Sequence, residues 1–299
     1  MPPIPRPAIP RGEIAAFARG SVRRARVATA DAIRDRIAGA DRRERAREIW
    51  ATPGPRRFAP EDPIWRVHND PAMFTGGLAA LLLQSLHPLA MAGVAGHSGY
   101  RGDPWGRLQR TSDYIAATTY GTVEEADRAI GRVRAIHDRV RGRDPRGIAY
   151  RASDPHLLAW VHAAEATAFL AAYQTFGPAP LTPADADRYV AQLGGIAARL
   201  GVIDPPGDTR SLHAVIEAYR PELQVTPAAR DTAAFLLREP PLPAAARPVY
   251  AGLAAGAVAL LPGWARRELG LRPSRGGRLA GSGATRLTRW ALTGAPPHR

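Results

Sequence analysis

The fold is decided by residues 122–141, which read TVEEADRAIGRVRAIHDRVR. Apolar side chains recur there at spacings of three and four residues, or their sum, at Val123, Ala126, Ile130, Val133 and Val140. This spacing is the period of one buried face of an α-helix. His137 occupies a position in the same series, where the pattern calls for an apolar side chain. The stretch therefore predicts an amphipathic helix that carries an imidazole on its buried face.

The preceding stretch, 104–120, predicts a helix with a polar face. Four residues share that face: Arg107, Arg110, Thr111 and Tyr114. Two guanidinium groups one turn apart repel each other unless an anion, such as a carboxylate, lies between them. A cofactor pocket shared with His137 accounts for this set. Two alternatives stay open, since the arginines can pair with Asp103 and Asp113, and His137 can be a hydrogen-bonded core residue.

Working outward, capping residues, prolines and glycines divide the chain into successive helices. We expect helices over 71–92, 104–120, 122–141, 154–176, 182–201, 210–220, 226–238 and 243–268. No sustained alternation of β-branched residues occurs, so few or no strands are expected. The predicted fold class is all-α, with a single multi-helix domain over 51–270. An Arg-rich helical extension is expected over 1–50, and a disordered basic tail over 271–299.

Composition excludes several kinds of chemistry. The 299 residues include no cysteine, so disulfides, zinc–thiolate sites, iron–sulfur clusters and thiolate-ligated haem are ruled out. The sequence also contains no lysine, since all of its Lys and Arg positions are arginine, so Schiff-base chemistry on a lysine is ruled out too. Eight histidines remain as strong nitrogen ligands. No phosphate-binding glycine loop, nucleophile elbow or HExxH zinc motif occurs.

The net charge of +14 is concentrated at the two ends. Residues 1–48 hold 12 Arg against 6 acidic residues, and residues 265–299 hold 8 against 1, whereas the region between them is nearly neutral. This distribution, without a recognition motif, predicts no nucleic-acid partner. The apolar stretches 76–96 and 249–264 fall short of a membrane span. We expect a cytoplasmic protein, with weak peripheral membrane contact as the most that the charge suggests.

A further candidate pair lies within 154–176. His162 and Glu165 are three residues apart, a spacing that can serve a metal ion. A non-haem metal oxidase built on His137, His162 and Glu165 is therefore one alternative function. A structural His–Glu pair is the other interpretation of this spacing. His156 lies near a predicted helix start and is interpreted as an ordinary histidine.

The order of several motifs resembles a known family. These are His87-Pro88, Gly93-Val94, His97-Ser98, Asp103-Pro104, Arg107-Leu108, Arg110-Thr111 and Tyr114, followed by the stretches 133–140, 154–176 and 181–183. Together they resemble the catalytic domain shared by MpaB-type oxygenases and bacterial rubber oxygenases (latex clearing proteins). The likeness covers about Ile64 to Gly270.

The resemblance implies an all-α protein with a buried pocket for one haem b, which one proximal histidine ligates. That role falls on His137, and Arg107 and Thr111 match distal residues of the rubber oxygenases. Arg110 stands where those enzymes have a lysine, and the glutamate that they carry just upstream of Arg107 has no counterpart here. Both departures favour the MpaB-like branch over polyisoprene cleavage.

The resemblance thus implies a haem-b-dependent oxygenase that uses O2 on an apolar, isoprenoid-like small molecule. His137 is expected to bind the iron, and Arg107, Arg110 and Thr111 to serve both cofactor binding and catalysis. A non-catalytic protein that binds haem or a hydrophobic ligand is a third alternative, beside the non-haem metal oxidase.

Overall fold

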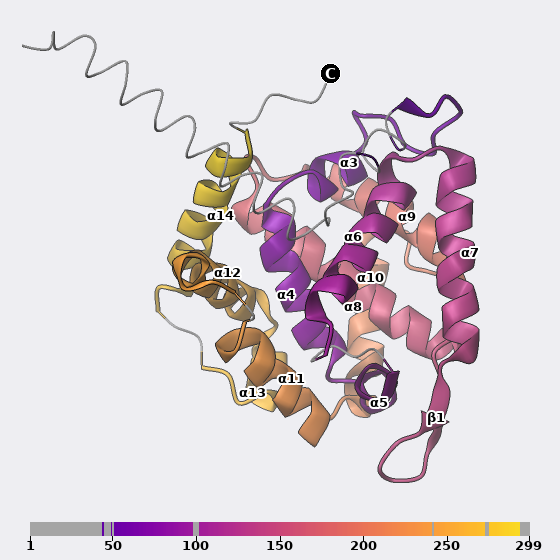
Figure 1. Ribbon diagram of the computed structural model, residues 1–299, viewed down its shortest axis with the longest axis vertical. Helices are drawn as coiled ribbons and strands as arrows, with labels where there is room; N and C mark the ends of the chain where they lie inside the picture. The colour runs from indigo at the N-terminus through magenta and orange to yellow at the C-terminus, as the bar shows by residue number, and fades with distance from the viewer. Residues whose placement is uncertain are drawn as a thin grey trace, which may run out of the picture.

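The computed structural model describes residues 44, 49, 51–97, 102–240, 242–272 and 275–293. Helices dominate the molecule, as Figure 1 shows, and the expected all-α class is confirmed. In the described part, the one sheet is the hairpin of β1 (Arg141–Arg143) and β2 (Ala149–Arg151), paired antiparallel. The extension expected over 1–50 lies almost entirely outside the described residues.

Most of the described helices begin at prolines or polar caps, as the sequence predicts. Their bounds are α3 (Pro63–His68), α4 (Ala72–Gln84), α5 (Pro88–His97), α6 (Pro104–Tyr120), α7 (Val123–Arg139), α8 (Pro155–Phe176), α9 (Pro183–Leu200), α10 (Thr209–Tyr219), α11 (Pro227–Arg238), α12 (Arg247–Leu260), α13 (Gly263–Glu268) and α14 (Gly277–Thr293). The short 3₁₀ helices η1 (Arg220–Glu222) and η2 (Ala244–Ala246) complete the described elements.

Helix α8 is the central element of the core. It packs along α4 and also contacts α9 and α10, so that other helices cover it on several sides (Figure 1). Trp160, Leu82 and Ile64 are fully buried where α8, α4 and α3 meet. Because α4 and α8 pack directly against each other, these apolar stretches form much of the protein core.

The helix expected over 71–92 is two helices. Helix α4 ends at Gln84 and α5 begins at Pro88, with a bend of 110° between them. The residue before a proline is disfavoured in helical conformation, which explains a break at His87. Among the described residues, no single helix is long and apolar enough to cross a membrane. Helices α4 and α5 reach that length and composition only as a bent pair.

Residues 277–293, which we expected to be disordered, form helix α14 against α12. Gly281 and Gly256 face each other at this contact, and a Cβ built on either would lie within 3 Å of the other's Cα. Arg289 also forms two hydrogen bonds to Asp70, of 2.8 and 2.7 Å. The glycines that suggested disorder permit close helix packing here, so the expectation of disorder is wrong for this segment.

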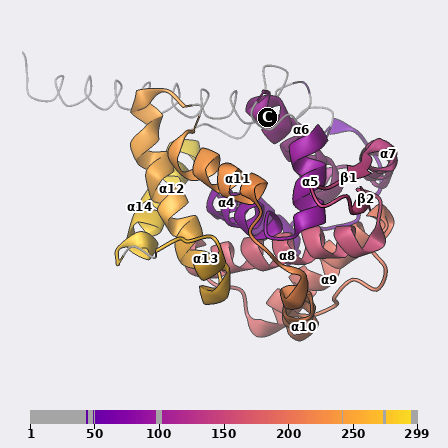
Figure 2. The same ribbon diagram turned by 90° about the horizontal axis from the view of Figure 1, so that it is seen from below.

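Helices α6 and α7 form an antiparallel pair on one side of the core. Only Gly121 and Thr122 separate them, and the two helices pack against each other. The hairpin follows α7 directly and lies beside α5 and α7 (Figure 2). The side chain of Tyr150 in β2 is buried, and its hydroxyl lies 3.4 Å from Nδ1 of His97. The residues predicted to bind a cofactor, in the first turns of α6 and the last turn of α7, lie away from the turn at Gly121 and Thr122.

Candidate functional site

The residues expected on the distal side of a cofactor lie in the first two turns of α6. The helix begins after Asp103, whose carboxylate accepts a 2.8 Å hydrogen bond from the Gly106 N–H, and Pro104 occupies its first position. Both features favour a helix start, because the side chain satisfies a free amide and the ring presets φ. The sequence therefore fixes where Arg107 and Arg110 stand.

Two of these side chains interact within α6 itself. Arg110 is exposed and lies 3.2 Å from the Asp103 carboxylate, the surface pairing that was the alternative for this residue. Thr111 is also exposed, and its hydroxyl donates to the Arg107 carbonyl at 3.0 Å. Arg107 is half-buried. The three residues share one end of α6, and Arg107 is the one that is partly withdrawn from solvent.

His137 lies in the last turn of α7. The helix starts with the predicted capping box, in which the Thr122 hydroxyl accepts from the Glu125 N–H and the Glu125 carboxylate accepts from the Thr122 N–H. A helix C-terminus favours a cationic histidine. Burial opposes this and lowers the pKa of His137, although Asp138 raises it in part. The imidazole is therefore neutral at pH 7, the form that binds a metal.

One ring nitrogen of His137 is buried without a hydrogen-bond partner. Nδ1 is inaccessible to solvent, and no donor or acceptor pairs with it among the residues that the structure describes. Buried polar atoms are almost always paired, so an exception needs a reason. Because α6 and α7 are consecutive, antiparallel helices (Figure 1), the last turn of α7 and the first turns of α6, which carry Arg107 and Thr111, both lie away from the turn that joins the helices.

His162 and Glu165 lie in the middle of α8. Burial lowers the pKa of His162 to about 4 and raises that of Glu165 to about 7. The Nε2 atom of His162 is also buried without a partner in the described part of the chain. At pH 7 the imidazole of His162 is therefore neutral and the carboxyl group of Glu165 is about half protonated. Such shifts are common at functional sites as well as in cores.

The set His137, His162 and Glu165, the alternative non-haem site, is not assembled as a metal cluster. Within the described ranges, one group of three such side chains brings its ligand atoms within 4.8 Å of one another: His87, His156 and Glu222. No motif in the sequence predicts this group. Its members are separated by more than 60 residues along the chain and share no motif, so no local pattern announces it.

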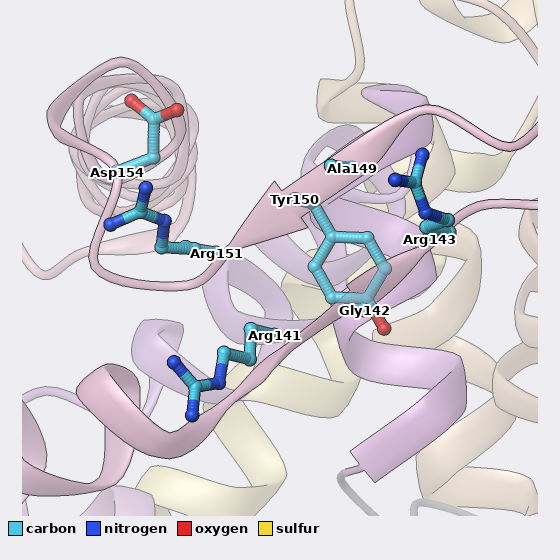
Figure 3. Close-up of a pocket in the computed structure, with 7 residues that line it drawn as sticks. All are labelled: Arg141, Gly142, Arg143, Ala149, Tyr150, Arg151 and Asp154. Carbon is cyan, nitrogen blue, oxygen red and sulfur yellow. The ribbon is translucent and has the colours of Figure 1, made fainter.

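An open hollow of about 520 Å³ lies beside the hairpin that follows His137. Its lining is strongly basic: Arg141, Gly142, Arg143, Ala149, Tyr150, Arg151 and Asp154. Arg141 and Arg151 are directly opposite each other in the strand register, and Figure 3 shows their guanidinium groups on the same side of the hairpin. Like charges in this position are unfavourable alone, so the hollow suits an anionic group.

Comparison with known families identifies the chain. Residues 65–290 match the model of the family described as ER-bound oxygenase mpaB/B'/Rubber oxygenase, catalytic domain. Comparison with curated proteins and with solved structures finds no match. The matched region includes α6, α7 and α8 and extends through most of α14. The chain therefore belongs to the MpaB/rubber oxygenase catalytic-domain family.

Proposed function

We propose that this protein is a haem-b-dependent oxygenase that uses O2 to oxidise an apolar small molecule, and that His137 would bind the iron. The observation that carries the proposal is the neutral, half-buried imidazole of His137, with an unpartnered ring nitrogen, in a member of an oxygenase family. A neutral imidazole is the usual nitrogen ligand of haem iron.

The ligands and charges that the chain offers are compatible with a haem. Without cysteine in the chain, an axial thiolate is impossible, and histidine is the strongest ligand left. Arg107 and Arg110 lie one turn apart on the neighbouring helix, where they can hold carboxylate groups such as haem propionates. Haem b, when bound, supplies the redox-active iron that the reaction with O2 requires.

The side chains of α6 contribute orientation and charge. Arg107 stays cationic at any working pH, so it stabilises negative charge that develops near it. The Thr111 hydroxyl proton is committed to the Arg107 carbonyl, so this hydroxyl must rotate before it can donate to a substrate. Arg110 must likewise exchange its partner Asp103 for a cofactor carboxylate. Both changes are inexpensive, because the two side chains are exposed.

The test is an absorption spectrum of the full-length protein purified from haem-supplemented cells. We expect a Soret band in the wild type and its loss, or a drop in haem content of at least tenfold, in His137→Ala. His213→Ala is the matched control, because His213 is exposed on α10 and should leave the band unchanged. Circular dichroism of each variant tests whether its helical fold is retained.

Three outcomes contradict parts of this proposal. A Soret band that survives His137→Ala moves the ligand to another histidine. A folded wild type without any Soret band, after reconstitution with hemin, rejects haem as the cofactor. A haem-loaded protein that consumes no O2 with a panel of apolar substrates and a reductant indicates a haem or hydrophobic-ligand carrier instead of an oxygenase.

A further inference from the structure

We propose that His87, His156 and Glu222 form a binding site for a divalent transition-metal ion of the zinc class, separate from the site on α6 and α7. The three ligands come from three parts of the fold: the break before α5, the first turn of α8, and η1. None of them lies on the helix that carries His137. Two imidazoles and one carboxylate are a ligand set that zinc and its neighbours in the periodic table take.

The interatomic distances suit such an ion. The Glu222 Oε2 atom lies 2.7 Å from His156 Nε2 and 3.5 Å from His87 Nε2. Ligand atoms of a tetrahedral zinc ion are separated by about 3.3 Å, given zinc–ligand distances near 2.0–2.1 Å. His156 and Glu222 are 51% and 44% exposed, so they can separate by the few tenths of an ångström that this requires.

The hydrogen bonds of Tyr219 favour the tautomer of His156 whose Nε2 lone pair points toward Glu222. The Tyr219 hydroxyl donates its proton to the His156 carbonyl at 2.7 Å, and its oxygen lies 3.2 Å from His156 Nδ1. Nδ1 must therefore carry a proton and donate it to Tyr219. In the neutral ring this leaves an unprotonated Nε2 only 2.7 Å from a carboxylate oxygen. Two lone pairs at this distance repel each other unless a cation, either a proton or a metal ion, lies between them.

His87 supplies the buried ligand. Its side chain is 3% exposed, and its Nε2 atom is buried without a hydrogen-bond partner, although it faces Glu222. The Ala90 N–H lies 3.5 Å from Nδ1, the outer limit of a hydrogen bond. The ring also lies within reach of the carbonyl of His87 itself. Metal binding at Nε2 places the ring proton on Nδ1, so the long hydrogen bond from the Ala90 N–H is exchanged for one that Nδ1 donates to the carbonyl of His87.

The surroundings complete the site. Tyr219 contacts His156 through both its ring and its hydroxyl, and such partners around a metal-bound histidine fix its orientation. Trp160 and Tyr219 pack near the His87 ring, which keeps the buried ligand in place. The exposure of the other two ligands leaves a coordination position open to water. The site is thus a three-ligand centre with one position for water or an exogenous ligand.

The experiment uses the full-length protein, with zinc as the probe. The protein is equilibrated with zinc chloride at pH 7.5, passed through a desalting column, and analysed for zinc by mass spectrometry. We expect one tightly held zinc ion per chain in the wild type. Glu222→Gln and His156→Ala should weaken the affinity at least tenfold, since even losing an outer partner of a metal ligand costs 10–100-fold. Both residues are half-exposed, so the variants should fold.

Two controls make the result decisive. His213→Ala removes an exposed histidine elsewhere on the surface and should retain the zinc. X-ray absorption at the zinc edge should show two imidazole nitrogens in the first shell of the wild type. Zinc that is retained equally by Glu222→Gln and His156→Ala, or a wild type that retains none, overturns the proposal. Because the readout is zinc, it is independent of the haem band, and the two proposals can fail separately.

Discussion

Helix α8 buries side chains along its whole length, whereas α6 and α7 bury theirs mainly near the turn that joins them. Buried residues of α8 run from Leu157 to Phe176. In α6 they lie at 117–119, and in α7 at 126–130. The other end of the α6–α7 pair, which carries Arg107 and His137, is half-buried or exposed. Stability is thus concentrated in the α4–α8 core, and the residues of the open end are available for binding.

The largest expected loss of stability comes from removing a large side chain from the core. Trp160→Ala should lower the free energy of unfolding by about 3–5 kcal/mol, because Trp160 is fully buried and its indole N–H donates to the Gln84 carbonyl at 3.1 Å. Urea denaturation measures the loss. Trp264→Ala is the matched control, since Trp264 is only partly buried, under Arg220. Equal losses in the two variants would show that the α4–α8 contact is not the main source of stability.

A second test addresses the one acidic residue inside α8. Burial raises the pKa of Glu165 from 4.5 to about 7 in the folded protein, so the unfolded chain releases this proton first. The free energy of unfolding should therefore fall as the pH rises from about 4.5 to about 7, and then level off. Glu165→Gln should remove this fall and stabilise the protein at pH 8 by about 1–3 kcal/mol.

Denaturation curves at pH 4 and pH 8 separate the two contributions. At pH 4 the carboxyl group is protonated in both states, so Glu165→Gln should change little there. Glu124→Gln, on the exposed face of α7, should change little at either pH. If Glu165→Gln destabilises the protein at pH 8, the carboxylate forms stabilising contacts in the fold, and the account of its pKa is wrong.

Most of the helices could be predicted because the signals that start, end and orient a helix lie within a few neighbouring residues. Capping residues, prolines at first positions and the spacing of apolar residues place α6 to α11 within a residue or two. The break at His87 was signalled by Pro88, but the continuous apolar run around it obscured the signal. Helix α14 could not be predicted, because Gly256 and Gly281 favour a helix pair only once they meet in space.

Some features of the candidate site could likewise be predicted from the sequence, and others could not. The helical spacing of His137 and of Arg107 follows from the sequence, and their placement at one end of an antiparallel pair follows from the short turn between the helices. The pairing of Arg110 with Asp103 was one of two alternatives, and only the structure decides it. The group of His87, His156 and Glu222 depends on long-range packing, so the sequence carries no signal for it.

A third test compares the two ends of the α6–α7 pair with the same substitution. Thr122→Ala removes half of the capping box at the turn and should cost about 1 kcal/mol. Thr111→Ala, at the open end, should change the free energy of unfolding by less than about 0.5 kcal/mol, because that hydroxyl bonds only to a carbonyl of its own helix. Thermal unfolding measures both. If the two substitutions lower the free energy of unfolding equally, the two ends of the α6–α7 pair do not differ in their contribution to stability.

A small effect on stability is also expected at Arg110. Its pairing with Asp103 joins two groups that are each about 60% exposed, and such pairs contribute about 0–1 kcal/mol. Asp103 also caps α6, so Asp103→Asn, which keeps an acceptor for the Gly106 N–H, is the proper partner of Arg110→Gln in a double-mutant cycle. Denaturant titrations of the four proteins should give a coupling below 1 kcal/mol.

The same variant separates a structural role of Arg110 from a cofactor role. If Arg110 holds a haem carboxylate, Arg110→Gln should retain less haem at equal stability, whereas Asp103→Asn should retain at least as much, because it releases the guanidinium from its competitor. Haem content from the Soret band measures both variants. A loss of stability in Arg110→Gln with haem content unchanged would assign this arginine to the surface of α6 alone. The cofactor site would then depend on His137 and on Arg107, the arginine that α6 partly withdraws from solvent.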